Sequence, residues 1–376
     1  MTDPTMAAQP LNEQLKQRVP AIPVTYFLIA ANLLVFLAML LSGAGFLHSP
    51  NAVQLAWGAN FGPATQDGQW WRLGTAMFLH FGVIHLLMNM GALWDGGRLV
   101  ERMYGHARFI GIYITSGLAG NLLSLVIQGN LAVSGGASGA IFGVYGALLA
   151  FLWLERNTLD AHEFRWMFWG AALFSGMIIL LGFVVPGIDN SAHIGGFVAG
   201  ILAGIVFNGP LSSPLRVDSR RVIALAAFIT GIVLLITHIP SAPYRWRDEV
   251  QVRKQIKQFL QEDQAVNRNW LEILNEGRQR DASFDELAGR IDTDVADHYA
   301  ESFEELSNLP LNPAMPSAKT LENTMQYAQK KRDASRALAE KLRAKADTEK
   351  AKPWFRYPAR PTGFKQPGLS NWVYSD

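Results

Sequence analysis

Apolar stretches long enough to cross a bilayer recur along the first two thirds of the chain. They lie near 24–44, 76–94, 109–127, 138–154, 166–185, 191–207 and 222–239. At about 1.5 Å per helical residue, each covers a hydrocarbon core of about 30 Å. The first stretch is too long for a signal peptide and further spans follow it, so we expect it to remain a membrane helix. The pattern predicts an all-α, polytopic membrane helix bundle.

Charge divides the chain into two parts. Residues 1–240 carry 11 Lys and Arg and 10 Asp and Glu, whereas the remaining 43 of the 64 charged residues lie in 241–376. This split indicates a lipid-embedded part followed by a water-exposed part. The net charge of +2 gives no sign of a nucleic-acid surface, and the absence of cysteine excludes a disulfide scaffold, a thiolate zinc site and a cysteine nucleophile.

The sequence predicts five segments. These are a cytoplasmic N-terminal segment 1–22, a six-helix core 23–209, a connecting loop with a seventh helix 210–240, a charged helical region 241–350 and a flexible Pro- and aromatic-rich end 351–376. In the charged region, apolar residues at helical spacing predict soluble helices over 245–348 that are broken at Pro310, Pro313 and Pro316.

The positive charges predict an orientation. The N-terminus and the loops near 95–108, 155–165 and 208–221 carry ten Lys and Arg, whereas the alternate loops carry only Arg72. Because Lys and Arg are retained on the cytoplasmic side, the N-terminus is expected inside and the charged tail outside. We expect a bacterial cytoplasmic membrane as the location.

Polar residues inside apolar spans are costly and mark functional candidates. His80, His85 and Asn89 fall in the second predicted span, and His193 falls in the sixth. His80 and His85 are five residues apart with no Glu between them, which does not fit a helical zinc motif, so no metal or other cofactor is expected. His85 and Asn89 are four apart and share a helix face.

A serine between glycines begins the fourth predicted span, in the segment Gly135-Gly136-Ala137-Ser138-Gly139. A serine at a helix N-terminus has free backbone N–H groups around it that can hold an oxyanion. Small residues at 139, 143 and 146 on this span, and at 196, 200 and 204 on the sixth, allow the two helices to pack closely. Close packing would bring Ser138 to His193 as a serine–histidine pair.

Together these residues resemble the rhomboid intramembrane serine proteases over roughly 20–240. The resemblance rests on Trp71-Arg72, His80-Phe81, His85, Asn89, Gly97, Glu101, Gly105, Gly136-Ala137-Ser138-Gly139 and Ala192-His193-Ile194-Gly195-Gly196. The family fold that it implies has six core transmembrane helices plus a seventh. The implied activity is hydrolysis of peptide bonds in or near transmembrane helices of single-span or multi-span membrane-protein substrates within the lipid bilayer.

The resemblance also implies a role for each site residue. Ser138 matches the nucleophile and His193 the general base. The oxyanion hole matches His85, Asn89 and the Ser138 N–H, with the Gly136 region in the same loop, and His80 matches a supporting histidine. The helix around 164–168 and the loop near 184–190 match a lateral gate.

Two residues leave questions open. Phe142 stands where some relatives carry a Tyr stacked on the histidine, and the stacking is expected to survive without the hydroxyl. Asp189, four residues before His193, is either a third catalytic member or, as the preceding Pro186 and Gly187 favour, an exposed loop residue.

Two other classes of function remain as alternatives. A catalytically inactive module that escorts membrane clients would typically lack the serine or the histidine, and this chain has both. A transporter or channel would carry charges along a path through its spans, and the interiors of the seven predicted windows hold no Asp or Glu.

Overall fold

The computed structural model describes residues 10–209, 217–279 and 282–350. The predicted C-terminal segment 351–376, and parts of the segments 1–22 and 210–240, lie outside the described residues. The chain divides into two compact units, Met1–Arg247 and Asp248–Asp376. Each unit is helical, and the described residues contain no strand beyond an isolated bridge between Asn60 and Ser134.

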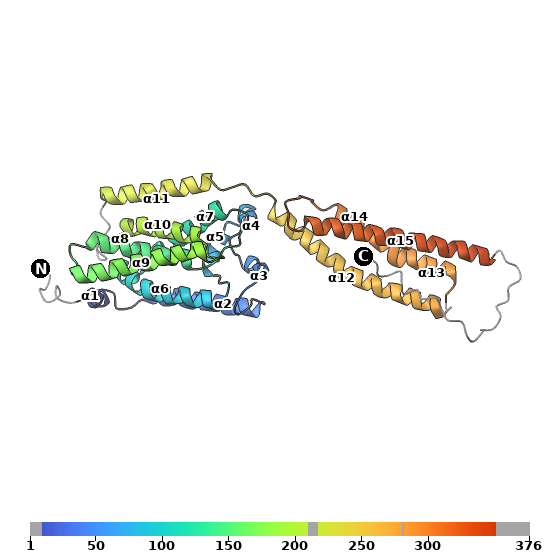
Figure 1. The fold of residues 1–376 in the computed structure, drawn as a ribbon, viewed down its shortest axis with the longest axis horizontal. Coiled ribbons are helices and arrows are strands. Elements are labelled where there is room, and N and C mark those ends of the chain that lie inside the picture. Colours follow the sequence, from blue (N-terminus) through green and yellow to red (C-terminus); the bar gives the residue numbers. More distant parts are fainter. Residues whose placement is uncertain (1–9, 210–216, 280–281, 351–376) are drawn as a thin grey trace. The chain divides into compact units, whose positions relative to one another are not determined.

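The first unit is a bundle of long helices (Figure 1). In chain order these are α2 (Pro23–Leu41), α6 (Val83–Tyr104), α7 (His106–Gln128), α8 (Ser138–Glu155), α9 (Ala161–Val184), α10 (Asn190–Phe207) and α11 (Ser219–Thr237). Short elements complete it: α1 (Leu11–Arg18), α3 (Asn51–Ala56), α4 (Gly62–Gln66), α5 (Arg72–Thr75) and the 3-10 turn η2 (Ala76–Phe78). Among the described residues, six helices are long and apolar enough to cross a membrane, and α5–η2 with α6 forms a seventh candidate bent by 92°.

The bend corrects the second predicted span. The helix begins at Val83 and not at residue 76, and it continues to Tyr104. Gly82 interrupts the apolar run in an extended conformation, and a Cβ there would lie 2.0 Å from the Leu47 carbonyl oxygen. Hydropathy alone cannot detect such a break. As a result His80 precedes the helix, and Glu101, which falls in the loop predicted near 95–108, lies inside α6.

Glycine contacts hold α8 against α10. A Cβ on Gly196 would lie 1.9 Å from the Gly139 carbonyl oxygen, and one on Gly200 would lie 2.0 Å from the Gly143 oxygen. The two backbones therefore touch directly. Close approach of small residues maximises van der Waals contact where lipid supplies no hydrophobic driving force between helices.

Buried polar contacts join several helices at the end of the bundle where α6 finishes. The fully buried Glu101 carboxylate accepts hydrogen bonds from the Val24 and Thr25 N–H groups and from the Thr25 hydroxyl, and it lies 2.6 Å from His106 Nδ1. It thereby caps the start of α2 and reaches the start of α7. The Tyr104 hydroxyl lies 2.9 Å from the Ala147 oxygen and 3.2 Å from the Gly204 oxygen, which links α6 to α8 and α10.

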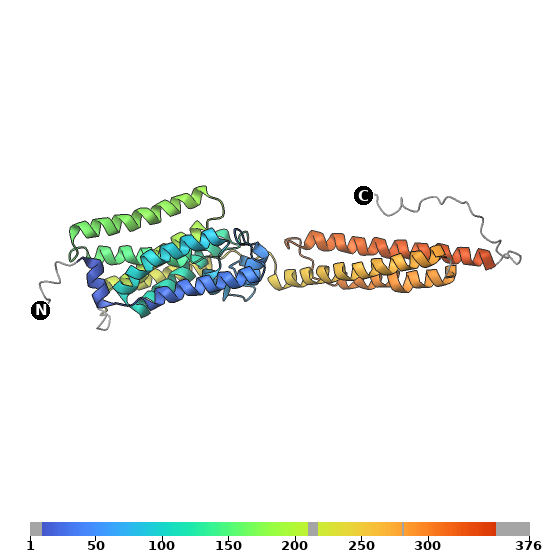
Figure 2. The ribbon, with the colours of Figure 1, turned by 90° about the horizontal axis from the view of Figure 1, so that it is seen from below.

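Helix α9 lies at the edge of the bundle. Only 11% of its most apolar stretch is buried, against 67% for α8. Figure 2 shows α9, in green, running beside the rest of the first unit. Its large apolar side chains, such as Trp166, Leu173 and Phe183, are exposed, as expected for a surface that faces lipid.

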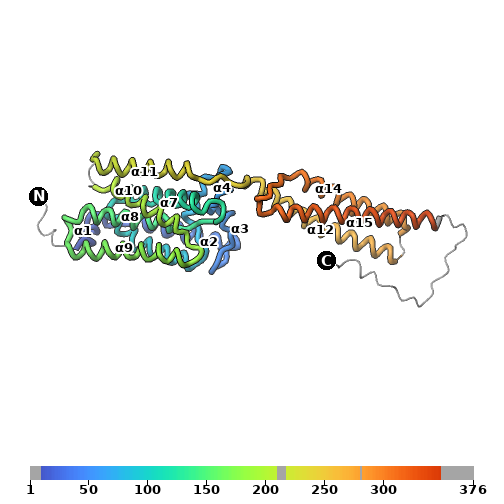
Figure 3. The backbone as a smooth tube through the Cα atoms, turned by 45° about the horizontal axis from the view of Figure 1, so that its top comes forward, coloured from blue at the N-terminus to red at the C-terminus, as the bar shows by residue number. Residues whose placement is uncertain are grey.

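The second unit is a bundle of helices rich in charged residues. Its helices are α12 (Trp246–Gln279), which starts at the boundary, then α13 (Phe284–Ile291), the π-helical turn η3 (Asp292–Ala296), α14 (Asp297–Ser307) and α15 (Ala318–Lys350), visible in Figure 3. The three prolines predicted to break helices lie between α14 and α15. A Ser283–Glu286 capping box starts α13. The Asp263 carboxylate accepts hydrogen bonds from the Tyr299 and Tyr327 hydroxyls, and burial, with Asp263 close by, raises the pKa of Tyr299.

Candidate active site

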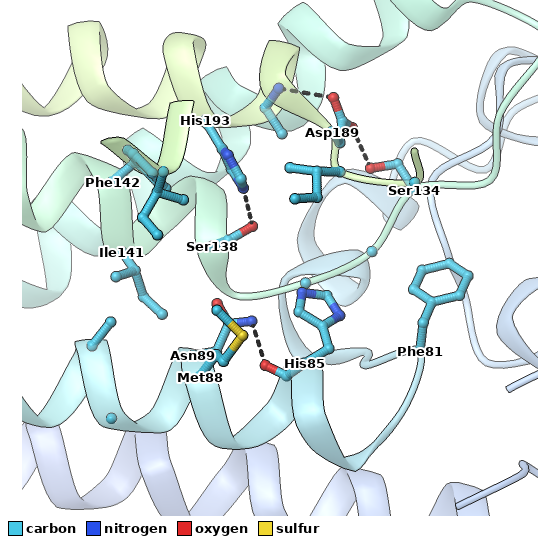
Figure 4. Close-up of a pocket in the computed structure, with 18 of the residues that line it drawn as sticks. Phe81, His85, Met88, Asn89, Ser134, Ser138, Ile141, Phe142, Asp189 and His193 are labelled. Atoms are coloured by element: carbon cyan, nitrogen blue, oxygen red, sulfur yellow. Dashed lines mark hydrogen bonds between the residues drawn. The ribbon is translucent and has the colours of Figure 1, made fainter. Parts of the chain in front are cut away.

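Ser138 and His193 meet where α8 and α10 begin. His193 Nε2 lies 2.9 Å from Ser138 Oγ, within hydrogen-bond distance (Figure 4). Ser138 is the first residue of α8 and half-buried, and His193 is buried in the first turn of α10. The backbone contact between Gly139 and Gly196, one residue after Ser138 and three after His193, sets this short separation.

Phe142 fixes the plane of the His193 ring. The two rings are stacked, with centroids 4.3 Å apart and planes 15° apart. His193 Nδ1 is buried and has no hydrogen-bond partner among the described residues. The histidine is therefore oriented by ring packing and by its helix rather than by a carboxylate.

The Asp189 carboxylate makes no hydrogen bond to the His193 ring among the described residues, and Asp189 is not an exposed loop residue; its backbone carbonyl accepts from the His193 N–H at 3.2 Å. It is the N-cap of α10, and Oδ1 accepts from the Ala192 N–H at 3.0 Å. Oδ2 accepts from the Ser124 and Ser134 hydroxyls, each at 2.5 Å. One carboxylate therefore ties α7 and the loop before Ser138 to the start of α10.

Sequence reasoning missed Ser124 and Ser134. A polar residue followed by an apolar helix is a recognisable N-cap signal, and it was present in Asp189-Asn190-Ser191 ahead of the sixth span. The partners of the second carboxylate oxygen come from 65 and 55 residues away, and no local pattern marks them.

His85, Asn89 and Gly136 face Ser138 from the other side. His85 and Asn89 lie in the first two turns of α6, and the Asn89 amide nitrogen donates to the His85 carbonyl at 2.9 Å. Gly136 has φ +152°, and a Cβ on it would lie 2.9 Å from the His85 ring. A glycine is therefore required for the loop to pass the histidine.

His80 lies outside this cluster. It is fully buried between η2 and α6, its ring centroid is 5.1 Å from that of His85, and its carbonyl accepts from the Gln54 amide at 2.9 Å. Its ring contacts that of His85, which lines the site.

A cavity of about 1440 Å³ opens over the cluster. Ser138, His193, His85, Asn89 and Gly136 all line it, and His80 does not. Its apolar wall includes Trp166, Met167, Phe174 and other residues of the loosely packed α9. No group of three His, Cys, Asp or Glu side chains that could hold a metal ion occurs within the described part of the chain.

Sequence comparisons with known proteins identify the family of the chain. Residues 67–209 match the model of the Rhomboid domain. The chain is 35% identical to Rhomboid protease GluP of Bacillus subtilis over 266 residues, which are 70% of this chain and 49% of GluP. It is 35% identical to RHOMBOID-like protein 4 of Arabidopsis thaliana over 190 residues, 45% of this chain and 47% of that protein. The chain thus spans about half the length of these two relatives.

A shorter relative is covered almost completely. The chain is 36% identical to "Putative rhomboid protease YdcA" of Bacillus subtilis over 180 residues, which are 48% of this chain and 86% of YdcA. The apolar helices and this similarity make the chain an integral, multi-pass membrane protein. With its fold, the match to the domain model and the coverage of YdcA, the chain belongs to the rhomboid family.

Proposed function

We propose that the protein is an intramembrane serine endopeptidase in which Ser138 and His193 form the catalytic pair. The 2.9 Å contact between His193 Nε2 and Ser138 Oγ, inside a large cavity, is the observation that carries the proposal. A serine hydroxyl is a weak nucleophile at neutral pH and needs an adjacent base within this reach.

The reaction follows from the two atoms. As Ser138 Oγ attacks the carbonyl carbon of the scissile bond, Nε2 takes its proton, and the imidazolium then gives that proton to the leaving amine nitrogen as the C–N bond breaks. Water, activated by the same nitrogen, hydrolyses the acyl-enzyme. Nε2 accepts a proton only in the tautomer that carries hydrogen on Nδ1, and stacking on Phe142 holds the ring in place during both transfers.

The oxyanion of the tetrahedral intermediate has donors on two sides. The Ser138 N–H belongs to the first turn of α8, where backbone donors have no partner within the helix. Asn89 Nδ2 carries two hydrogens and donates one to the His85 carbonyl, so the second is available. The His85 ring beside Gly136 supplies a third donor from the same direction.

We propose membrane-protein segments as substrates. The cavity wall formed by α9 is apolar and α9 is little buried, so an unwound transmembrane segment can enter from the lipid side at small cost in lost packing. His80, whose ring contacts that of His85, is assigned a positioning role.

The test compares wild type with Ser138→Ala and His193→Ala in liposomes that contain a fluorogenic single-span substrate. Each variant is expected to lose about 10³-fold or more in kcat/KM, because either residue alone is insufficient. The exposed Ser42 and His162 provide matched controls, Ser42→Ala and His162→Ala, which keep wild-type rates.

A serine-reactive phosphonate separates catalysis from substrate choice. The proposal expects labelling of wild type at Ser138 and none in Ser138→Ala. Full cleavage by Ser138→Ala, or a wild-type chain that neither cleaves nor reacts with the phosphonate, would refute the proposal and favour a client-binding module.

A further inference from the structure

A second concave pocket lies at the opposite end of α6 from the active site. Its volume is about 370 Å³, and α1, α2 and the last turns of α6 enclose it. Three basic side chains line it, Lys16, Arg98 and Arg102, together with the aromatic pair Tyr26 and Trp94. No acidic residue is among the lining residues.

The basic groups are incompletely neutralised. Arg102 Nε donates to the Val19 carbonyl at 3.2 Å, and Arg102 makes no ion pair among the described residues. The nearby carboxylates are those of Glu13, 2.8 Å from Lys16, and Asp95, 3.1 Å from Arg98. Both ion pairs are exposed, and each joins two residues of the same helix, in α1 and in α6 respectively. Such pairs contribute little to stability, so Lys16 and Arg98 can exchange these carboxylates for another anion.

One donor at this pocket is already removed from water. Arg98 Nε is buried and has no hydrogen-bond partner within the described residues. A buried guanidinium N–H without an acceptor is costly, so a rotation of the Arg98 side chain that brings Nε to an incoming oxygen gains a charge-assisted hydrogen bond. Arg98 and Arg102 are four apart on α6, which places their guanidinium groups on one helix face.

The depth of the pocket in the membrane selects the ligand. It lies where α2 begins at Pro23, at the end of an apolar span. Tyr26 and Trp94 have ring centroids 5.5 Å apart, and such rings favour the headgroup level of a bilayer. From this level, the exposed Leu34 and Leu37 of α2 run toward the hydrocarbon core.

We propose that this pocket binds the phosphate group of an anion at the membrane surface, with Arg98, Arg102 and Lys16 as its donors. Phosphate oxygens suit the planar donor fork of arginine, and basic pockets between transmembrane helices at this level bind anionic headgroups. The source of the phosphate is either an anionic phospholipid, whose acyl chains lie along α2, or free phosphate. The pocket does not include Ser138 or His193, so this proposal can be tested independently of the proposed catalysis.

Native mass spectrometry of the full-length protein in a neutral detergent tests the proposal. Phosphatidylglycerol, phosphatidylcholine and inorganic phosphate are titrated separately. Wild type is expected to retain one phosphatidylglycerol at a concentration about tenfold lower than Arg98→Gln/Arg102→Gln, and to show no such difference for phosphatidylcholine. Retention of inorganic phosphate with the same dependence on the two arginines would instead identify free phosphate as the source.

Two further variants test the role of Lys16 and control for the loss of a basic side chain. Lys16→Gln changes an exposed side chain of α1 and should weaken retention about threefold without affecting folding. Arg156→Gln is the matched control, since Arg156 is a basic residue that lies over the Trp153 ring and does not line the pocket. Equal retention of phosphatidylglycerol and phosphate by wild type and both pocket variants, or an equal loss in Arg156→Gln, would overturn the proposal.

Discussion

At the scale of single residues, the site depends on packing in place of a third charged group. His193 has its ring held by Phe142 and its Nδ1 without a partner among the described residues, while the nearest carboxylate, Asp189, is fully engaged elsewhere. The orientation of the His193 ring is thus an indirect product of helix capping and ring stacking.

The stacking gives a first prediction. Phe142→Ala removes a ring contact of the kind measured at about 0.5–1.5 kcal/mol, which corresponds to a loss of about 2- to 12-fold in kcat/KM if the ring orientation is needed in the transition state. Phe142→Tyr retains the ring and should stay within about twofold of wild type. Liposome cleavage rates measure both, and an unimpaired Phe142→Ala would show that the stack plays no part.

A second prediction concerns Asp189. Asp189→Ala removes the cap of α10, a change of about 0.5–2 kcal/mol, and also releases the Ser134 loop beside Ser138. We expect a lower Tm and about a tenfold fall in kcat with little change in KM. Asp189→Asn keeps an acceptor for the Ala192 N–H, so its Tm and kcat should lie between those of wild type and Asp189→Ala.

Asp160 supplies the matched control for that experiment. It caps α9 by accepting from the His162 and Glu163 N–H groups, and it is exposed and distant in sequence from both Ser138 and His193. Asp160→Ala should lower Tm to a similar extent and leave kcat unchanged. A comparable loss of kcat in both variants would mean that Asp189 acts through stability alone.

At the scale of elements, the contact between α8 and α10 leaves no room for a side chain at Gly196. Gly196→Ala would place a Cβ 1.9 Å from a backbone oxygen, so the helices must separate. Overpacking of this kind costs about 1–3 kcal/mol, and for a protein of this size we expect Tm to fall by about 2–10 °C.

Helix α9 offers the control for the glycine variant. A Cβ on Gly176 meets nothing within 4 Å, so Gly176→Ala should leave Tm unchanged or raise it through helix propensity. Thermal unfolding followed in detergent compares the two variants. Equal effects would contradict the inference that backbone contact, and not glycine itself, matters at Gly196.

The elements also show what the sequence could and could not reveal. Apolar length located the helices, and small-residue spacing anticipated the contact that brings Ser138 to His193. Hydropathy placed His80 inside a helix because it registers composition and not the break at Gly82. The hydroxyl partners of Asp189 and the looseness of α9 arise from residues far apart in the chain, which no window along the sequence contains.

At the scale of the whole molecule, the arginine distribution predicts that the residues after α11 lie outside the cytoplasm. The chain has no cysteine, so single cysteines can be introduced without background. Gln329 is exposed on α15, and Asn157 is exposed between α8 and α9. A membrane-impermeant maleimide added to intact cells or spheroplasts should label Gln329→Cys and should reach Asn157→Cys only after lysis. The reverse labelling would invert the orientation.

The buried Glu101 has a consequence for how the protein is made. In lipid its carboxylate needs every partner it has, and these lie at Val24 and Thr25, already synthesised, and at His106, five residues further on. Synthesis proceeds from the N-terminus, so this corner of the bundle can close soon after residue 106 leaves the ribosome. The corner formed by α2, α6 and α7 around Glu101 is then in place before α8 and α10, which carry Ser138 and His193, are synthesised.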